Sequence, residues 1–209
     1  MRKYLLLSGA LLLGLGVFAS AQVNVVPSVG TISAVVKQNT YSAVSIGLVP
    51  ASAATDIFCI SGSATRSIGI KQITISGTAG TLVSLPLTLL HRAKLDTGGT
   101  AATTTALPVA FPLFSTEPAA TATLTAYTAN PTINDSSPGY VRTSVLSLNT
   151  TSALVSPAPL LWYAGEQLAL FARSIDIPAG ATTEQYCVNA NAVSVSSGVV
   201  NIDILWVEG

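Results

Sequence analysis

The feature that most constrains this chain is an alternation of apolar and polar residues with a period of two. Between Val200 and Trp206 the even positions hold Val, Ile, Ile and Trp, and the odd positions hold Asn, Asp and Leu. A strand with one buried face has this period, whereas a helix repeats about every 3.6 residues. Trp206 shares the apolar phase and is therefore predicted to lie in the core.

Residues 83–89 repeat the alternation, with Pro86 in the opposite phase. A proline inside a strand indicates an edge strand or a bulge, because it cannot donate a ladder hydrogen bond. Between Ser67 and Ser76 the apolar phase shifts, which predicts a β-bulge near Lys71 and Gln72. The other expected strands are residues 32–36, 43–48, 56–60, 141–148, 167–172 and 193–195.

These segments contain many Val, Ile and Thr residues and few Glu, Lys or Gln between them, so long helices are not expected. Turn-forming residues separate the strands, as in Ser137-Pro138-Gly139 and Ser197-Gly198. About eight to ten short strands with frequent turns predict an all-β protein, an antiparallel β-sandwich of the jelly-roll kind. An immunoglobulin-like sandwich would give the same pattern and is the alternative.

The N-terminal 21 residues form a separate unit. Arg2 and Lys3 precede a mostly apolar stretch, and Ala19-Ser20-Ala21 has the small-x-small form of a cleavage site. Residues 1–21 are therefore predicted to be a secretory signal peptide, with a retained N-terminal anchor as the alternative. Residues 22–54 are expected to form N-terminal strands or an extension, and residues 55–209 the β-sandwich domain.

A long segment from residue 91 to residue 132 interrupts the strand pattern. It contains an Ala/Thr tract and prolines at positions 108, 112 and 118, and it has few charges. Loops of this length are usually functional or ordered by a partner. We expect a long loop that lies over a neighbour, with Leu124 and Tyr127 as a brief return to the sheet.

The chain carries very little charge. Charged residues make up 9% of it, whereas about a quarter is usual for soluble proteins. Arg2 and Lys3 account for two of the nine basic residues, so the remainder has no basic patch for nucleic acid. A surface of Ser, Thr, Ala and Asn is typical of proteins packed into an assembly. We therefore expect self-association or binding to neighbouring structural proteins.

Cys59 and Cys187 are the two cysteines of the chain. After export they would meet an oxidising compartment, so a disulfide between them is expected, with two free buried thiols as the alternative. The sequence contains no CxxC motif and no His/Cys cluster, and we expect neither a metal nor a cofactor.

The sequence offers no catalytic motif. His91 is its single histidine, no serine lies in a G-x-S-x-G elbow, and the acidic residues are scattered singly. We expect no enzymatic activity and assign no catalytic residues. Trp162 and Tyr163 are candidate contacts for a partner or a cell-surface glycan, because aromatic rings stack on sugars, although Trp162 also suits the core. A secreted carbohydrate-binding module is therefore the alternative function.

Short motifs follow one another in a recognisable order from Thr55 to the C-terminus. They are Thr55-Asp56-Ile57-Phe58, Gly62-Ser63-Ala64-Thr65, Ile75-Ser76-Gly77-Thr78, Thr97-Gly98-Gly99-Thr100, Pro118-Ala119-Ala120-Thr121-Ala122, Ala126-Tyr127-Thr128-Ala129-Asn130-Pro131-Thr132, Gly139-Tyr140-Val141-Arg142 and Ile202-Asp203-Ile204-Leu205-Trp206-Val207-Glu208. This series resembles a family of small β-sandwich proteins from tailed-phage structural gene clusters and bacterial genomes, mostly known as hypothetical or virion-associated proteins.

The resemblance implies a non-enzymatic structural or adhesive component of a virion or surface assembly, and it brings no catalytic residues. The signal peptide, Cys59 and Cys187 depart from the family. Because phage heads assemble in the cytoplasm, this departure favours an exported protein of the cell surface, periplasm or medium, with the virion as the alternative. Membrane contact is expected only through the N-terminal segment, if that segment is not cleaved.

Overall fold

The computed structural model describes residues 39–50, 53–100, 109–111, 118–150, 158–164, 175–191, 195 and 197–209, with 109–111 as backbone only. These residues belong to one compact unit, Lys37–Gly209. The expected signal peptide lies outside the described residues, as do the strands expected at 32–36 and 167–172. Of the strand expected at 193–195, the structure describes Val195 alone, outside any strand.

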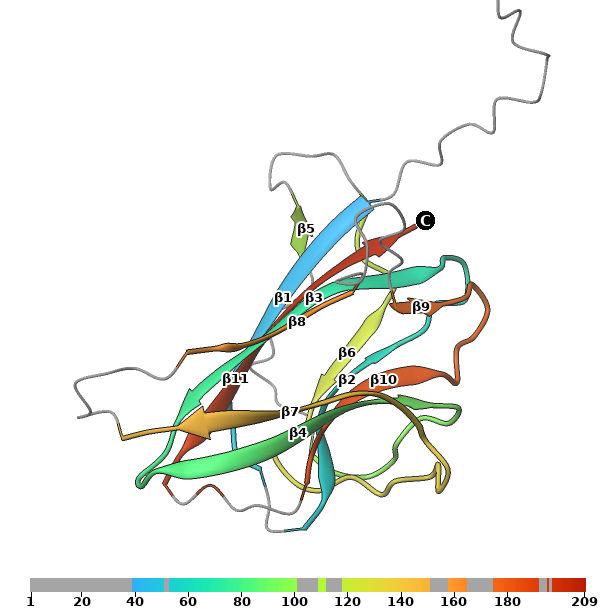
Figure 1. The fold of residues 1–209 in the computed structure, drawn as a ribbon. Coiled ribbons are helices and arrows are strands. Elements are labelled where there is room, and N and C mark those ends of the chain that lie inside the picture. Colours follow the sequence, from blue (N-terminus) through green and yellow to red (C-terminus); the bar gives the residue numbers. More distant parts are fainter. Residues whose placement is uncertain are drawn as a thin grey trace, which may run out of the picture. The chain divides into compact units, whose positions relative to one another are not determined.

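The described residues form eleven β-strands and no helix (Figure 1). The strands are β1 (Asn39–Leu48), β2 (Thr55–Ser61), β3 (Ile68–Thr78), β4 (Val83–Arg92), β5 (Val109–Phe111), β6 (Thr123–Ala126), β7 (Gly139–Leu148), β8 (Leu160–Tyr163), β9 (Ile175–Ile177), β10 (Gln185–Ala190) and β11 (Val199–Glu208). Sheet A has the order β5-β1-β11-β3-β8, with β9 also on β3, and sheet B has the order β6-β2-β10-β4-β7. Both sheets are antiparallel and pack face to face, so the predicted β-sandwich is confirmed.

The strand pairs are nested in the manner of one long hairpin that has been rolled up. The pair β4·β7 is innermost in the chain, followed by β3·β8, β2·β10 and finally β1·β11. Successive pairs alternate between sheet B and sheet A, which is the arrangement of a jelly roll (Figure 1). An immunoglobulin sandwich would keep its first two strands in one sheet, whereas β1 and β2 lie in different sheets here.

The core lies between the two sheets and follows the predicted alternation. Along β11, Val200, Ile202, Ile204 and Trp206 are all completely buried. The Trp206 ring stacks on Tyr41 of β1 with the ring centroids 5.6 Å apart. The predicted bulge is also confirmed, because Leu205 pairs with Gln72 and Trp206 with Ile70, which leaves Lys71 as the extra residue.

The expectation that Pro86 marks an edge strand or a bulge is wrong. Its strand β4 lies between β10 and β7, and the bulge of β4 and β7 lies at Leu89 and Leu90. The proline is tolerated because the pairing of β4 with β10 ends at Leu87. No strand residue opposite Pro86 therefore requires a backbone N–H from it. Its carbonyl oxygen instead accepts a hydrogen bond from the Asn191 backbone N–H at 3.1 Å.

Two segment boundaries differ from the sequence-based expectation. The sheet begins before Thr55, because β1 lies within the segment 22–54 and pairs with β11 along most of its length. The segment 91–132 is not all loop, because β6 returns to sheet B beside β2 and Thr97 forms a bridge with Thr132. The brief return expected near Leu124 is thus observed, with Leu124 opposite Ile60.

Candidate functional site

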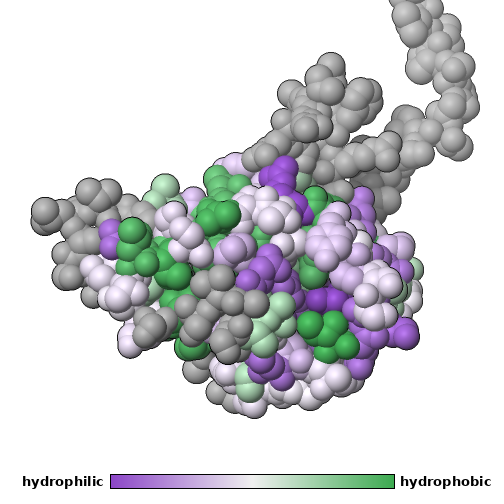
Figure 2. Space-filling model, turned by 60° about the horizontal axis from the view of Figure 1, so that its bottom comes forward, coloured by the Kyte–Doolittle hydropathy of each residue, from purple (hydrophilic) through white to green (hydrophobic). Residues whose placement is uncertain are grey.

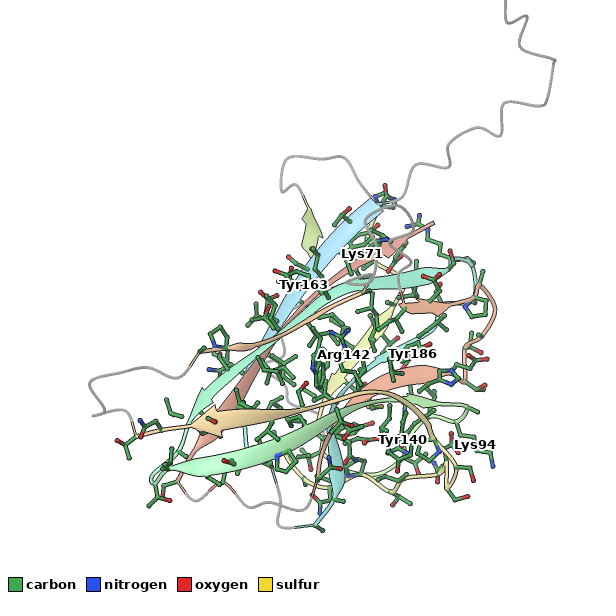
Figure 3. All side chains as sticks on the ribbon, viewed as in Figure 1. Lys71, Lys94, Tyr140, Arg142, Tyr163 and Tyr186 are labelled. Atoms are coloured by element: carbon green, nitrogen blue, oxygen red, sulfur yellow. A yellow bond between two sulfur atoms is a disulfide. The ribbon has the colours of Figure 1, made fainter. Side chains whose placement is uncertain are left out.

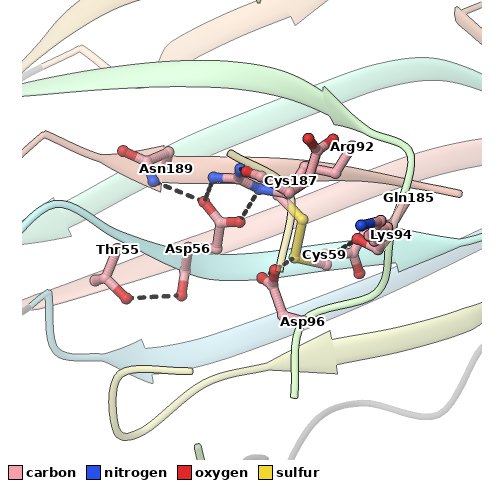
Figure 4. Close-up of a disulfide and its surroundings, with 10 residues drawn as sticks. Thr55, Asp56, Cys59, Arg92, Lys94, Asp96, Gln185, Cys187 and Asn189 are labelled. Carbon is pink, nitrogen blue, oxygen red and sulfur yellow. Dashed lines mark hydrogen bonds and ion pairs between the residues drawn. A yellow bond between two sulfur atoms is a disulfide. The ribbon is translucent and has the colours of Figure 1, made fainter. Parts of the chain in front are cut away.

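A disulfide lies at the centre of sheet B (Figure 4). Cys59 of β2 and Cys187 of β10 stand directly opposite each other, with their Cα atoms 4.1 Å apart. Both side chains are completely buried. The predicted disulfide is therefore present, and it fits an oxidising environment.

A buried ion pair lies next to the disulfide on the same face of sheet B. Asp56 of β2 is fully buried and accepts hydrogen bonds from both Nε and Nη2 of Arg92, the latter at 2.9 Å from Oδ1. Asn189 of β10 donates a further hydrogen bond to the same Oδ1 at 2.6 Å. Three donors thus satisfy this carboxylate, which is the condition for burying a charge without a large penalty.

A bulge in β2 places Asp56 on this face. Asp56 pairs with Asn189 and Phe58 with Val188, so Ile57 is the extra residue. Ile57 and Phe58 both enter the core, and Asp56 is turned to the outer side together with Cys59. Strict alternation would have put Asp56 and Cys59 on opposite faces.

Asp96, which follows β4, completes this polar cluster. Burial raises the pKa of Asp96 to about 7, and the neighbouring Asp56 adds to the rise because a proton on Asp96 can bond to that carboxylate. The potential ligand atoms of Asp56, Cys59, Asp96 and Cys187 all lie within 4.8 Å of one another. Because both sulfur atoms are bonded in the disulfide, neither is a thiolate, and only the two carboxylates remain as potential metal ligands.

A polar pocket of about 360 Å³ opens beside the cluster. Asp96 and Gln185 line it together with hydroxyl groups and an aromatic ring contributed by Ser61, Ser63, Thr121, Thr123, Thr125, Thr182 and Tyr127. Burial, and then the charges of Asp96 and Asp56, raise the pKa of Tyr127 to about 12, so its hydroxyl keeps its proton. The pocket therefore offers several hydrogen-bond donors and acceptors beside the apolar side chains of Ala64 and Leu95.

The two aromatic residues singled out from the sequence lie on β8 in different environments. Trp162 is buried and its indole N–H donates to the Ser144 hydroxyl at 3.1 Å, so its ring is not a surface platform. Tyr163 is 43% exposed. It stands at a pocket of about 170 Å³ between the sheets, which Trp162 and Arg142 also line (Figure 3).

His91 is held by an acidic partner at the end of β4. Its Nε2 lies 3.0 Å from Oε2 of Glu184, and its ring packs against Tyr186 at a centroid distance of 4.9 Å. None of the hydrogen bonds found among the described residues joins His91 to a serine or threonine. Among the described residues, His91 thus has an acidic partner, and no hydroxyl group is hydrogen-bonded to its ring.

The polar cluster could not be found from motif spacing. Its members come from β2, from the end of β4 and from β10, and β10 was not among the expected strands. The available signal was the alternation of Gln185, Cys187 and Asn189 with Tyr186 and Val188, in which the outer phase is polar and yet buried.

No family model, curated protein or solved structure matches this chain. The described part of the chain also contains no helix with the length and apolar character needed to cross a membrane.

Proposed function

We propose that this chain is a non-enzymatic structural or adhesive module that docks a weakly charged face of its sandwich on neighbouring proteins. The observation that carries the proposal is the outer face of sheet A, formed by β1, β11, β3 and β8. Strand pairing aligns Val44, Asp203, Thr74 and Leu161 in one row across these strands. The next row is Ser42, Leu205, Gln72 and Tyr163.

Large apolar side chains are exposed on this face. Val44, Ile46, Leu161 and Tyr163 are all exposed, Ile46 to 63%. The four strands contain three charged residues, namely Lys71, Asp203 and the buried Glu208. Partial desolvation raises the pKa of Asp203, which lies in the middle of the face. Covering such a face with a partner would cost little desolvation of charge.

The remaining surface supports the same proposal. In the view of Figure 2, pale, weakly polar residues make up much of the described surface, with small groups of apolar residues among them. Jelly rolls occur in viral capsid and lectin domains, but a fold alone does not decide a function. The composition of the sheet A face and the low charge of the whole chain support the docking role more directly than the fold does.

We further propose that the protein works outside the cytoplasm. The buried disulfide supports an oxidising compartment, and the N-terminal 21 residues have the pattern of an export signal. The cell surface, periplasm or medium is the proposed location, and a virion is the alternative.

The decisive experiment compares two leucine-to-lysine variants in the native source. Leu161→Lys places a charge on the sheet A face, whereas Leu82→Lys places the same charge in the exposed turn between β3 and β4. After fractionation by size, the wild type and Leu82→Lys are expected in a large assembly or envelope fraction, and Leu161→Lys in the free fraction. A wild-type protein that travels alone and binds no surface or particle would refute the proposal.

A second candidate function is the binding of a glycan, which the hydroxyl-lined pocket beside Asp96 favours over the buried Trp162. A glycan array with the wild type, Thr125→Val and Tyr163→Ala would separate the two possible sites. Loss of binding with Thr125→Val indicates the polar pocket, and loss with Tyr163→Ala indicates a site at the exposed ring of Tyr163 on β8. An array without any bound glycan eliminates this candidate.

A further inference from the structure

We propose that the outer edge of β7, which no described strand covers, pairs antiparallel with β7 of a second copy, so that two sandwiches share one continuous ten-stranded sheet. This inference rests on the proposed assembly function and names one partner, a second copy of the chain. It concerns a different surface from the sheet A face, and the two can be tested separately.

β7 is a long strand at the end of sheet B. The other strands at the ends of the two sheets are short: β5 and β9 have three residues each, and β6 and β8 have four each. β7 has ten residues and, among the described strands, pairs only with β4. Natural proteins keep exposed edge strands short or blocked because unpaired backbone groups recruit other strands. β7 is thus the longest of the strands that end the described sheets, although β1 is also unpaired beyond Ser42 on the side of β5.

Backbone N–H and C=O groups of alternate β7 residues point outward from the edge of the sheet. The Pro86 carbonyl accepts from Asn191 on the β10 side of β4, so it points away from β7. Because Pro86 stands opposite Val145, this is a pair without mutual hydrogen bonds. The N–H and C=O of Val145 therefore point outward from the edge, and so do those of Thr143 and Ser147 two residues away.

β7 lacks the proline and lysine residues that commonly prevent an edge strand from pairing with another strand. Its single charged residue, Arg142, lines the pocket between the sheets. Val145 is 57% exposed and Tyr140 is also exposed. A row of alternating outward donors and acceptors is complementary to itself under a two-fold rotation, which is the commonest symmetry of protein dimers. With the axis at Val145, Thr143 of one copy stands opposite Ser147 of the other.

The test uses two substitutions of the same residue. Val145→Pro removes one outward N–H and leaves the ladder to β4 intact, whereas Val145→Ala removes the side chain but keeps the N–H. Sedimentation velocity over a concentration series is expected to show a dimer for the wild type and for Val145→Ala. For Val145→Pro, which loses the central hydrogen bond in both copies, we expect a dissociation constant at least about tenfold higher.

A crosslinking experiment keeps the proposal testable even if Val145→Pro does not fold. Across the axis, Val145→Cys would bring two thiols together with Cα atoms about 5.5 Å apart, within disulfide range. Thr143→Cys would hold its thiols more than about 10 Å apart, because the two positions are offset by four residues. Mild oxidation is expected to give a covalent dimer with Val145→Cys only.

A monomeric wild type, equal dissociation constants for Val145→Pro and Val145→Ala, or a dimer that Val145→Cys does not crosslink would each overturn the edge pairing. These outcomes leave the proposed function standing if Leu161→Lys still releases the protein from its assembly. Conversely, a Val145-dependent dimer that binds no larger assembly supports the edge pairing alone.

Discussion

Arg92 reaches across β10 to pair with Asp56, so this buried ion pair joins two strands of sheet B that are not neighbours. Asn189, on the intervening strand, bonds to the same carboxylate. Arg92 also donates from Nη1 to the backbone oxygen of Asp135 at 3.1 Å, in the segment between β6 and β7. The Arg92 guanidinium therefore links β4, β2 and a loop, and Asn189 adds β10 through the shared carboxylate.

Replacing Arg92 with methionine should destabilise the protein by about 3–5 kcal/mol, because it leaves the Asp56 charge buried without its partner. Urea denaturation monitored by tryptophan fluorescence measures this loss. The double variant Asp56→Leu/Arg92→Met is the control, and it should lose clearly less stability, since no buried charge remains. A single variant as stable as the wild type would show that Asp56 is solvated in solution.

Stability should fall as the pH rises through the range set by Asp96. Its pKa is about 7 in the folded protein and close to 3.8 in the unfolded chain, so between these values the folded state holds the extra proton. Stability is therefore greatest below about pH 4 as far as this group is concerned, decreases up to about pH 7 and then levels off. Because Asp96 is partly exposed, we expect a change on the order of 1 kcal/mol.

Asp96→Asn removes this titration and keeps an amide that can donate to Asp56. Melting temperatures between pH 4 and pH 8 should then decline less for the variant than for the wild type. Parallel curves for the two proteins would contradict the assignment of the pH dependence to Asp96.

Loss of the disulfide should cost about 5 kcal/mol, because the bond closes a loop spanning 128 positions of the chain. The comparison is between the oxidised protein and Cys59→Ala/Cys187→Ala in urea denaturation. Since both sulfur atoms are buried, a mild reductant should leave the native bond intact until the protein unfolds. A double variant within about 1 kcal/mol of the wild type would refute the loop-closure argument.

Truncation of Trp162 should lower the stability of the protein much more than truncation of Tyr163. Trp162→Ala should cost about 3–5 kcal/mol because it empties a buried site and leaves the Ser144 hydroxyl without its indole donor. Tyr163→Ala should change stability by less than about 0.5 kcal/mol because the ring is exposed. Thermal unfolding of both variants checks this, and a large loss with Tyr163→Ala would indicate that its ring is part of the core.

The period of the sequence identified the strands with the clearest alternation, such as β11, because one face of each enters the core and the other does not. The bulge at Lys71 was predictable for the same reason, since an extra residue shifts the apolar phase. The order of the strands was not predictable in this way. Alternation records which face of a strand is buried, but it does not record which strands are neighbours.

The candidate site could not be recognised from the sequence because several of its buried residues are polar, whereas buried residues are usually apolar. Gln185 and Asn189 are buried on the outer side of sheet B, where they donate hydrogen bonds to the Lys94 backbone carbonyl and to the Asp56 carboxylate, respectively. The sequence thus showed Cys187 as half of a disulfide, whereas the alternation around it was not recognised as a strand because its outer phase is polar. Asp56 was a similar case, because only the bulge at Ile57 brings it beside the disulfide.

The nested pairing of the strands also has a consequence for the order of events during synthesis. β11 lies between β1 and β3 and follows both in the chain, so sheet A cannot close until residues Val199–Glu208 have been synthesised. A fold dominated by such distant pairings is reached slowly, typically in milliseconds to seconds. The nascent chain therefore stays open until the ten-residue strand Val199–Glu208 is complete, and a chain truncated before Val199 leaves both β1 and β3 without their shared partner.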